Sequence, residues 1–170
     1  MFGVLPDRIA TDQLLATGGR LQGQIALGRL RRLTESLETA PIADDLATAD
    51  LELLPDPQAN GRLRGRIQAG LRLRCERCGK PMTWPVSTAI ALYLVGSEAA
   101  AASLPEDADY VVAADSLNVL ELIEEELLLA LPLVARHPAG TPCGDNARQG
   151  PVAESGERSS PFDVLKKLKT

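Results

Sequence analysis

The chain has 170 residues and a formal net charge of −5, and it contains one histidine and only five aromatic residues. A single histidine excludes metal sites built from several histidines, and five aromatic residues leave few faces on which nucleotide bases could stack. The first eight residues lack the features of a secretory signal, and the apolar run 127–135 is too short to span a membrane. We therefore expect a soluble cytoplasmic protein with reduced thiols, no contact with membranes and no small-molecule substrate.

The charge is distributed unevenly along the chain. Residues 1–95 carry twelve Lys or Arg and ten Asp or Glu, whereas residues 96–170 carry six and thirteen. The front half is therefore mildly basic and the back half is acidic, so the net charge alone does not describe the surface that a partner meets.

The first predicted elements lie between residues 21 and 61. Alternation of apolar and polar residues predicts a short strand over 21–27, and the spacing of Leu30, Leu33 and Leu37 predicts a short amphipathic helix that starts from Gly28. Residues 44–54 predict a second strand. The turn-rich segment 55–61 ends in Asn-Gly and predicts a connection to an antiparallel neighbour.

Residues 62–74 form the clearest predicted strand. Its odd positions are mostly apolar and its even positions are mostly arginine, so one face of the strand is apolar and the other is basic. The strand enters a turn over 75–81, and residues 82–95 predict the returning strand of a three-stranded meander. The basic residues of this face and turn are Arg62, Arg64, Arg66, Arg72, Arg74, Arg77 and Lys80.

Three interpretations of this arginine-rich face stay open. Guanidinium groups about 7 Å apart along a strand approach the phosphate spacing of an RNA strand, and arginine suits bidentate phosphate contacts. A solvated face that resists edge aggregation gives the same pattern. In the third interpretation, the acidic segment 96–116 or the helix after it covers the arginines, which would then be structural.

The back half contains one strong helix signal. Residues 96–116 are an acidic, alanine-rich connection that we expect to be mobile, and Asp115 or Ser116 is predicted to cap a helix over 117–131. The glutamate run 124–126 is predicted to lie on a solvated face of this helix.

These elements predict an α+β domain over residues 1–137, in which one long helix packs on an antiparallel meander and flexible acidic loops connect the elements. Residues 138–160 are rich in Pro, Gly, Ser and charge and are predicted to be a flexible linker. Residues 161–170, with apolar residues and lysines interspersed, are predicted to be an amphipathic docking segment.

The pair Cys75 and Cys78 is the sharpest local motif. Two cysteines separated by two residues in a tight turn place two thiolates close enough to share one zinc ion, and Gly79 permits the positive φ that such a zinc knuckle needs. His137 and Cys143 are the remaining candidate ligands. Three reduced cysteines without metal are the alternative. Thiol redox catalysis fits less well, because the pair lies between two strands and not at a helix N-terminus.

No enzyme motif is present in the sequence. There is no phosphate-binding loop or dinucleotide fingerprint, and a catalytic triad would have to use His137, which lies in a predicted loop beside Pro138. We therefore expect no catalysis.

Three separated segments support one resemblance when they are taken together: residues 73–81, residues 120–137 followed by Cys143, and residues 160–169. Their order and spacing resemble the bacterial YceD family of large ribosomal RNA subunit accumulation proteins. The resemblance implies a role in the synthesis, processing or stability of 23S rRNA without known catalysis. It also implies that the partner is 23S rRNA or its precursor, or a large-subunit assembly protein.

The expected function is therefore that of a non-catalytic ribosome-biogenesis factor that binds the RNA backbone through the arginine-rich face. The alternative is a protein-interaction adaptor. Such an adaptor would dock a ribosomal protein or an RNA-processing enzyme through the acidic helix and the C-terminal segment.

Overall fold

The computed structural model describes residues 3–16, 19–37, 40–42, 44–138, 141 and 143. The predicted docking segment 161–170 and nearly all of the predicted linker 138–160 therefore lie outside the described residues. The elements in chain order are β1 (Arg8–Ala10), α1 (Thr11–Ala16), β2 (Arg20–Ala26), a 3-10 turn (Leu27–Arg29), α2 (Arg31–Ser36), β3 (Leu46–Asp56), β4 (Ala59–Arg74), β5 (Pro81–Val95), α3 (Glu98–Ala101), β6 (Tyr110–Val112), β7 (Ser116–Asn118) and α4 (Val119–Leu129).

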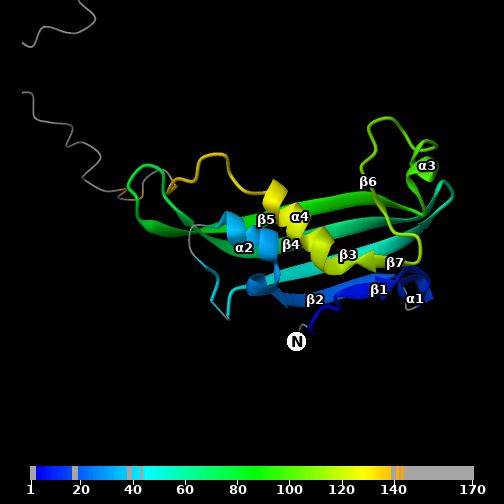
Figure 1. Ribbon diagram of the computed structural model, residues 1–170, viewed down its shortest axis with the longest axis horizontal. Helices are drawn as coiled ribbons and strands as arrows, with labels where there is room; N and C mark the ends of the chain where they lie inside the picture. Colours follow the sequence, from blue (N-terminus) through cyan, green and yellow to red (C-terminus); the bar gives the residue numbers. More distant parts are fainter. Residues whose placement is uncertain are drawn as a thin grey trace, which may run out of the picture.

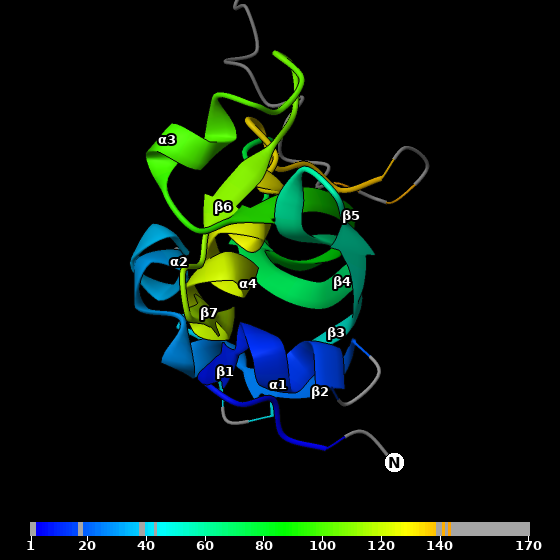
Figure 2. The same ribbon diagram turned by 90° about the vertical axis from the view of Figure 1, so that its right-hand side faces the viewer.

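A five-stranded sheet in the order β2-β3-β4-β5-β6 forms the body of the protein (Figure 1). Strands β2 to β5 make an antiparallel meander, and β6 pairs in parallel with the last three residues of β5. Figure 2 looks along the strands and shows α2 and α4 together on one side of the sheet. The predicted α+β class, with an antiparallel meander and a helix packed on it, is confirmed.

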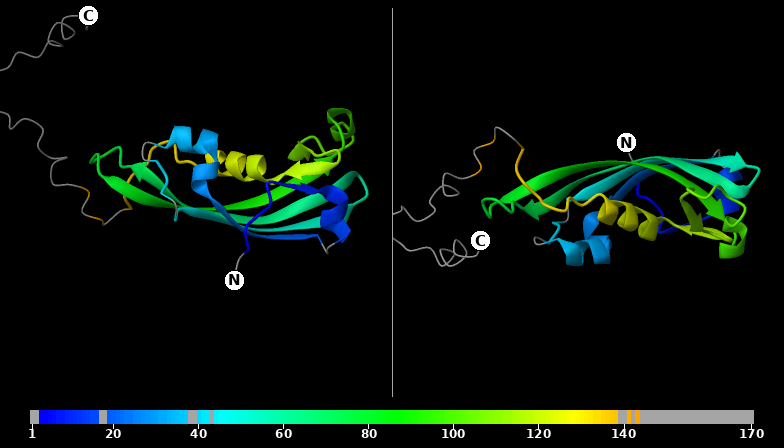
Figure 3. Two further views of the ribbon diagram at one scale, coloured as in Figure 1. Left: turned by 60° about the horizontal axis from the view of Figure 1, so that its bottom comes forward. Right: turned by 90° about the horizontal axis from the view of Figure 1, so that it is seen from above.

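The alternation of β4 decides which face of the sheet the helices cover. The side chains of Leu63, Ile67 and Leu71 are completely buried and belong to the main core, to which α4 contributes Ile123 and Leu127. The arginines at the even positions face the other side. The sheet curves around the helices, so the apolar face lies inside the curve and the arginine face outside it (Figure 3, left).

The connection between β3 and β4 is tighter than predicted. Only Pro57 and Gln58 form the turn, and the predicted Asn-Gly pair lies within β4. The reason is local, because the carboxylate of Asp56 accepts a hydrogen bond from the Gln58 N–H at 2.9 Å and closes the turn early.

Several short elements were not predicted, because the short strands arise from long-range pairing and α3 is too short to show a helical period. Strand β1 pairs with β7, and the acidic segment 96–116 contains α3 and β6. Helix α4 begins after Asn118, whose side chain accepts a hydrogen bond from the Glu121 N–H at 3.3 Å. The prediction of Asp115 or Ser116 as the cap is therefore wrong, since the pairing of β7 with β1 delays the helix. None of the described helices is long and apolar enough to cross a membrane.

The expectation that all glutamates of the run 124–126 face water is wrong for Glu124, which is 9% exposed. Its carboxylate accepts hydrogen bonds from the N–H groups of Arg32 and Leu33, at 2.7 and 3.3 Å, and from the Arg32 Nε at 2.9 Å. Glu124 of α4 therefore caps the first turn of α2. Burial acts to raise the pKa of Glu124, but these hydrogen bonds and the charge of Arg32 outweigh it and hold the pKa below its ordinary value of 4.5.

This contact predicts a pH-dependent contribution to stability. Because the pKa of Glu124 is lower in the folded than in the unfolded chain, the stabilisation is present above about pH 4.5 and is lost as the pH falls through the folded pKa. We expect Glu124→Gln to lower the free energy of unfolding by about 2 kcal/mol at pH 7. The neighbouring variant Glu125→Gln, which loses only a longer, exposed contact with Arg32, is the matched control and should change it little.

Denaturant unfolding at pH 7 and pH 3.5 checks this expectation. The difference in the free energy of unfolding between Glu124→Gln and wild type should be smaller at the lower pH. A gap that is absent at pH 7, or that is the same at both pH values, would contradict the capping role.

Candidate metal centre and basic surface

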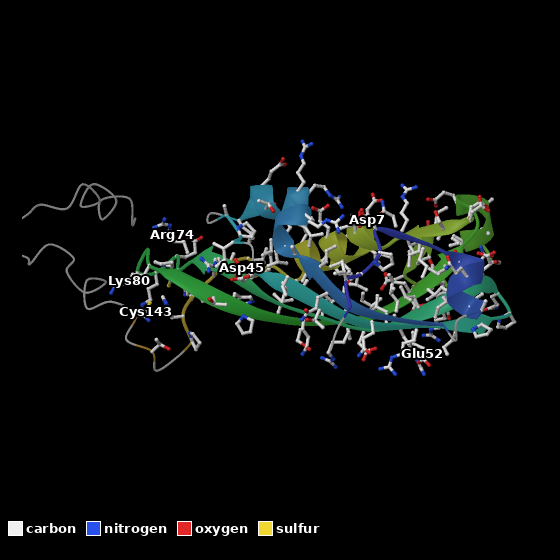
Figure 4. The ribbon with its side chains drawn as sticks, turned by 90° about the horizontal axis from the view of Figure 1, so that it is seen from below. Asp7, Asp45, Glu52, Arg74, Lys80 and Cys143 are labelled. Carbon is white, nitrogen blue, oxygen red and sulfur yellow. The ribbon has the colours of Figure 1, made fainter. Side chains whose placement is uncertain are left out.

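Strands β4 and β5 meet in a turn that we call the hairpin tip, residues 74–80. The N–H of Cys75 donates to the Lys80 carbonyl at 2.9 Å, and the N–H of Gly79 donates to the Cys75 carbonyl at 2.8 Å. Gly79 has φ of +70°, the conformation predicted for it. Figure 4 shows Arg74 and Lys80 near Cys143 at this end of the sheet.

The chain returns to the hairpin tip after α4. The N–H of Glu76 donates to the Ala135 carbonyl at 2.8 Å, and this backbone hydrogen bond fixes the segment that carries His137 beside the turn. Two segments about sixty residues apart in sequence therefore share one end of the molecule.

All four predicted metal ligands come together there. The Sγ atoms of Cys75 and Cys143 are 3.5 Å apart, and Nδ1 of His137 lies 3.6 Å from the Sγ atoms of both Cys78 and Cys143. The four ligand atoms lie within 4.8 Å of one another. In a tetrahedral zinc site, bonds of about 2.3 Å to sulfur and 2.0–2.1 Å to nitrogen separate the ligand atoms by about 3.5–3.8 Å. We call these residues the Cys3His cluster.

Hydrogen bonding between the side chains explains the geometry only in part. The Nδ1 atom of a neutral imidazole carries either one hydrogen or one lone pair, so it makes one hydrogen bond. It nevertheless lies at the same distance from the sulfurs of Cys78 and Cys143. The four ligand atoms lie close enough together that they could hold one metal ion.

Backbone N–H groups around Cys75 favour the thiolate form of its side chain. Burial acts to raise the pKa of this thiol, but the N–H groups of His137, Cys78 and Arg77 and the Cys143 thiol donate to its sulfur and lower the pKa from 9.0 to about 5. Burial and the two neighbouring sulfurs raise the pKa of Cys143 to about 11. The thiolate of Cys75 is therefore stabilised by backbone amides of the hairpin tip and of His137, and not by a helix N-terminus, in contrast to redox thiols of the thioredoxin type.

The seven basic residues predicted from sequence do not form one uniform surface. The helices pack on the other face of the sheet, so neither α4 nor the segment 96–116 covers the arginines. Neighbouring carboxylates, however, neutralise part of the row. Arg64 pairs with Glu52 at 3.0 Å, and Arg72 pairs with Asp45 at 3.1 Å.

The other two arginines in the strand interior have different neighbours. The guanidinium of Arg62 lies 5.1 Å from the ring centre of Tyr93, and Nη1 of Arg66 donates to the Ser87 hydroxyl at 3.0 Å. Neither has a carboxylate within ion-pair distance among the described residues.

Several exposed cations gather at the hairpin tip. Arg77 and Lys80 are exposed, and Arg74 donates to the Gly79 carbonyl at 2.8 Å. The exposed Arg136, which precedes the ligand His137, adds a cation that the sequence reasoning missed. The sequence signal that could have identified Arg136 is its position next to His137, a candidate ligand. We call Arg74, Arg77, Lys80 and Arg136 the basic tip; Glu76 is the one acidic residue within these two short segments.

The fold and the site thus define a class of small α+β protein in which a Cys3His cluster and a basic tip lie at the same end of the sheet. The family model described as "Large ribosomal RNA subunit accumulation protein YceD" matches residues 63–169. The protein of that name from Haemophilus influenzae is 29% identical over 153 residues, which cover 86% of each chain. No solved structure matches the chain. The chain belongs to the YceD family, and the resemblance based on three sequence segments is confirmed.

Proposed function

We propose that this chain is a non-catalytic ribosome-biogenesis factor that supports the accumulation of 23S rRNA by binding the RNA backbone. The name of the Haemophilus relative supports the link to the large-subunit RNA. The observation that carries the mechanism is the basic tip, where exposed cations gather at one end of a sheet whose other arginines are partly neutralised.

The chemistry of the tip favours phosphates over bases. Arginine and lysine bind phosphate oxygens whatever the sequence, whereas reading single-stranded bases needs aromatic stacking. The guanidinium of Arg62 already lies over the ring of Tyr93, and the hairpin tip has no aromatic residue. Arg66 extends the proposed contact along the outer face, and Arg62 provides a more distant one. Arg64 and Arg72 contribute less, because their ion pairs would have to open.

Reversing two charges of the tip tests this mechanism. We expect Arg77→Glu/Lys80→Glu to weaken binding to a 23S rRNA fragment by about tenfold or more and to make the plot of log affinity against log salt concentration about 1.5 less steep, since each lost phosphate contact removes about 0.7–0.9 from the slope. Fluorescence anisotropy at several salt concentrations measures both quantities.

The control is Arg8→Glu/Arg31→Glu, which changes the net charge equally at exposed positions away from the tip. This control should retain most of the affinity and the slope. Equal losses in the two double variants would show that net charge, and not the basic tip, governs binding.

We also propose that the Cys3His cluster holds one zinc ion with a structural role. Four protein ligands leave no open coordination position for a substrate or a water molecule, as is typical of structural zinc sites. Bound there, the zinc would link the hairpin tip to the segment after α4, and so position Arg77, Lys80 and Arg136 relative to one another.

Metal analysis of the protein purified under reducing conditions tests the zinc proposal. We expect about one zinc per chain in the wild type and much less in Cys78→Ser, with a melting temperature lower by about 5 °C or more. The exposed neighbour Glu76→Ser is the control and should keep its zinc, because its side chain is not part of the cluster. Wild-type protein with almost no metal would contradict the proposal.

One observation favours a second function, that of a protein-interaction adaptor. At and beyond the end of α4, Leu129 is 82% exposed and Leu133 is fully exposed, which leaves apolar surface beside the acidic helix. Affinity capture of the tagged chain with and without nuclease separates the two functions. Ribosomal proteins lost on nuclease treatment were held through RNA, whereas partners that stay bound support the adaptor.

A further inference from the structure

Among the described residues, no strand pairs with the outer edge of β5 over most of its length. Strand β5 pairs with β4 along Pro81–Leu94, but on its other side β6 pairs only with Tyr93, Leu94 and Val95. In the view from above, the middle of β5 is not covered by the helices (Figure 3, right).

The register shows which groups face this edge. The N–H of Tyr93 donates to the Asp109 carbonyl at the start of β6, at 2.9 Å, so the odd-numbered residues of β5 direct their N–H and C=O groups away from β4. Ser87, Ala89 and Ala91 therefore present donors and acceptors at the edge, and no described residue forms a backbone hydrogen bond with these groups. Pro85 is also odd-numbered. Its lack of a backbone N–H therefore affects the outer edge and removes no hydrogen bond to β4.

This edge lacks the protection that free strand edges usually have. Charged side chains, above all lysines, normally prevent another strand from pairing there. Strand β5 has no charged residue in its fifteen positions, and the side chains of Ser87, Ala89 and Ala91 on the outer face are small and exposed. Proline protects only its first half.

The surroundings indicate what kind of strand fits the edge. On α4, Glu124 and Glu125 contact Arg32 of α2, whereas Glu126 lies two positions after Glu124, about 200° around the helix, and so on the side away from α2. Burial, together with the charges of Asp109 and Glu125, raises the pKa of Glu126. The exposed Leu129 lies one helical turn after Glu126, on the same side of α4. An incoming strand would thus meet apolar surface and then, near β6, acids that form no ion pair with the residues that the structure describes.

A second copy of the chain is a poor occupant. The available window lies between Pro85 and Tyr93, about seven residues, whereas β5 itself has fifteen. In an antiparallel pair centred on this window, the long β5 of the second copy would run into β6. The window suits a short extended segment that lies in line with β6.

We propose that residues 162–167 of this chain add to the free edge of β5 as a short strand, with Phe162 and Val164 on the side of Leu129 and with Lys166, on the same face, directed toward Asp109 and Glu126. The segment itself lies outside the described residues. The 18 residues between Cys143 and Phe162 span up to about 60 Å, whereas the distance along β5 from the hairpin tip to Ser87 is about 20 Å. The order of the segment, apolar residues followed by lysines, matches the order of the surroundings in a strand parallel to β5. Tethering also raises the local concentration of such a segment to about the millimolar range.

Amide hydrogen exchange of the full chain, followed by NMR, tests the proposal. We expect the amides of Ser87, Ala89 and Ala91 to be protected in the wild type and to exchange about tenfold faster or more in Phe162→Glu/Val164→Glu. The amides of Thr88, Ile90 and Leu92 bond to β4 and report whether β5 itself has opened, so they should not change. A synthetic peptide of residues 160–170 should restore protection to the variant.

The matched control is Ser155→Glu/Ser159→Glu, which adds the same charge before the docking segment and should leave the edge protected. Fast exchange of the three edge amides in the wild type would overturn the proposal, as would protection that the Phe162 and Val164 substitutions do not change. Protection that rises with protein concentration would assign the edge to a second copy and would equally overturn it. None of these results depends on RNA binding or on zinc.

Discussion

The structure depends on the requirement that strand β4 meet two different environments along its whole length. Its odd positions must be apolar, because α4 and the core pack on them, and its even positions are free to carry charge because they face away from the helices. The same strand ends at Arg74, and the next residue, Cys75, is the first ligand of the Cys3His cluster at the hairpin tip. The core, the outer arginines and the cluster therefore share one register, and a shift of one residue would disrupt all three.

The electrostatics of the outer face depend on which strand lies beside each arginine. In the middle of the sheet, β3 supplies Asp50 and Glu52, which pair with Arg20 and Arg64. Past the end of β3, Asp45 still pairs with Arg72, whereas Arg77, Lys80 and Arg136 form no side-chain ion pair within the part of the chain that the structure describes. A chain with a net charge of −5 can thus present a local positive surface, because most of its acids lie on other elements.

Local signals in the sequence were sufficient for part of this structure. The alternation of β4 and the glycine after Cys78 report on single strands and turns, and both were predicted correctly. The four residues of the Cys3His cluster could be named because the chain holds no other cysteine or histidine. The sequence could not show that they come within 4.8 Å, since this depends on a backbone hydrogen bond between Glu76 and Ala135.

The remaining features arise from contacts between distant residues, which have no periodic signature. Glu124 reads as a solvated helix residue until α2 is placed beside it, and the pairing of β1 with β7 moves the start of α4. The ion pairs of Arg64 and Arg72 likewise need the register of β3 and the position of Asp45. For this reason the sequence overestimated how uniform the arginine surface is and did not single out its end.

Ultraviolet crosslinking of the protein to RNA in cells, followed by mass spectrometry of the crosslinked peptides, tests the central claim most directly. The claim is that the basic tip contacts large-subunit RNA. The crosslinks should map to peptides that contain residues 74–80 and Arg136, and the attached RNA should come from 23S rRNA or its precursor. Crosslinks confined to α4 or the N-terminal elements, or no crosslinked RNA above background, would contradict it.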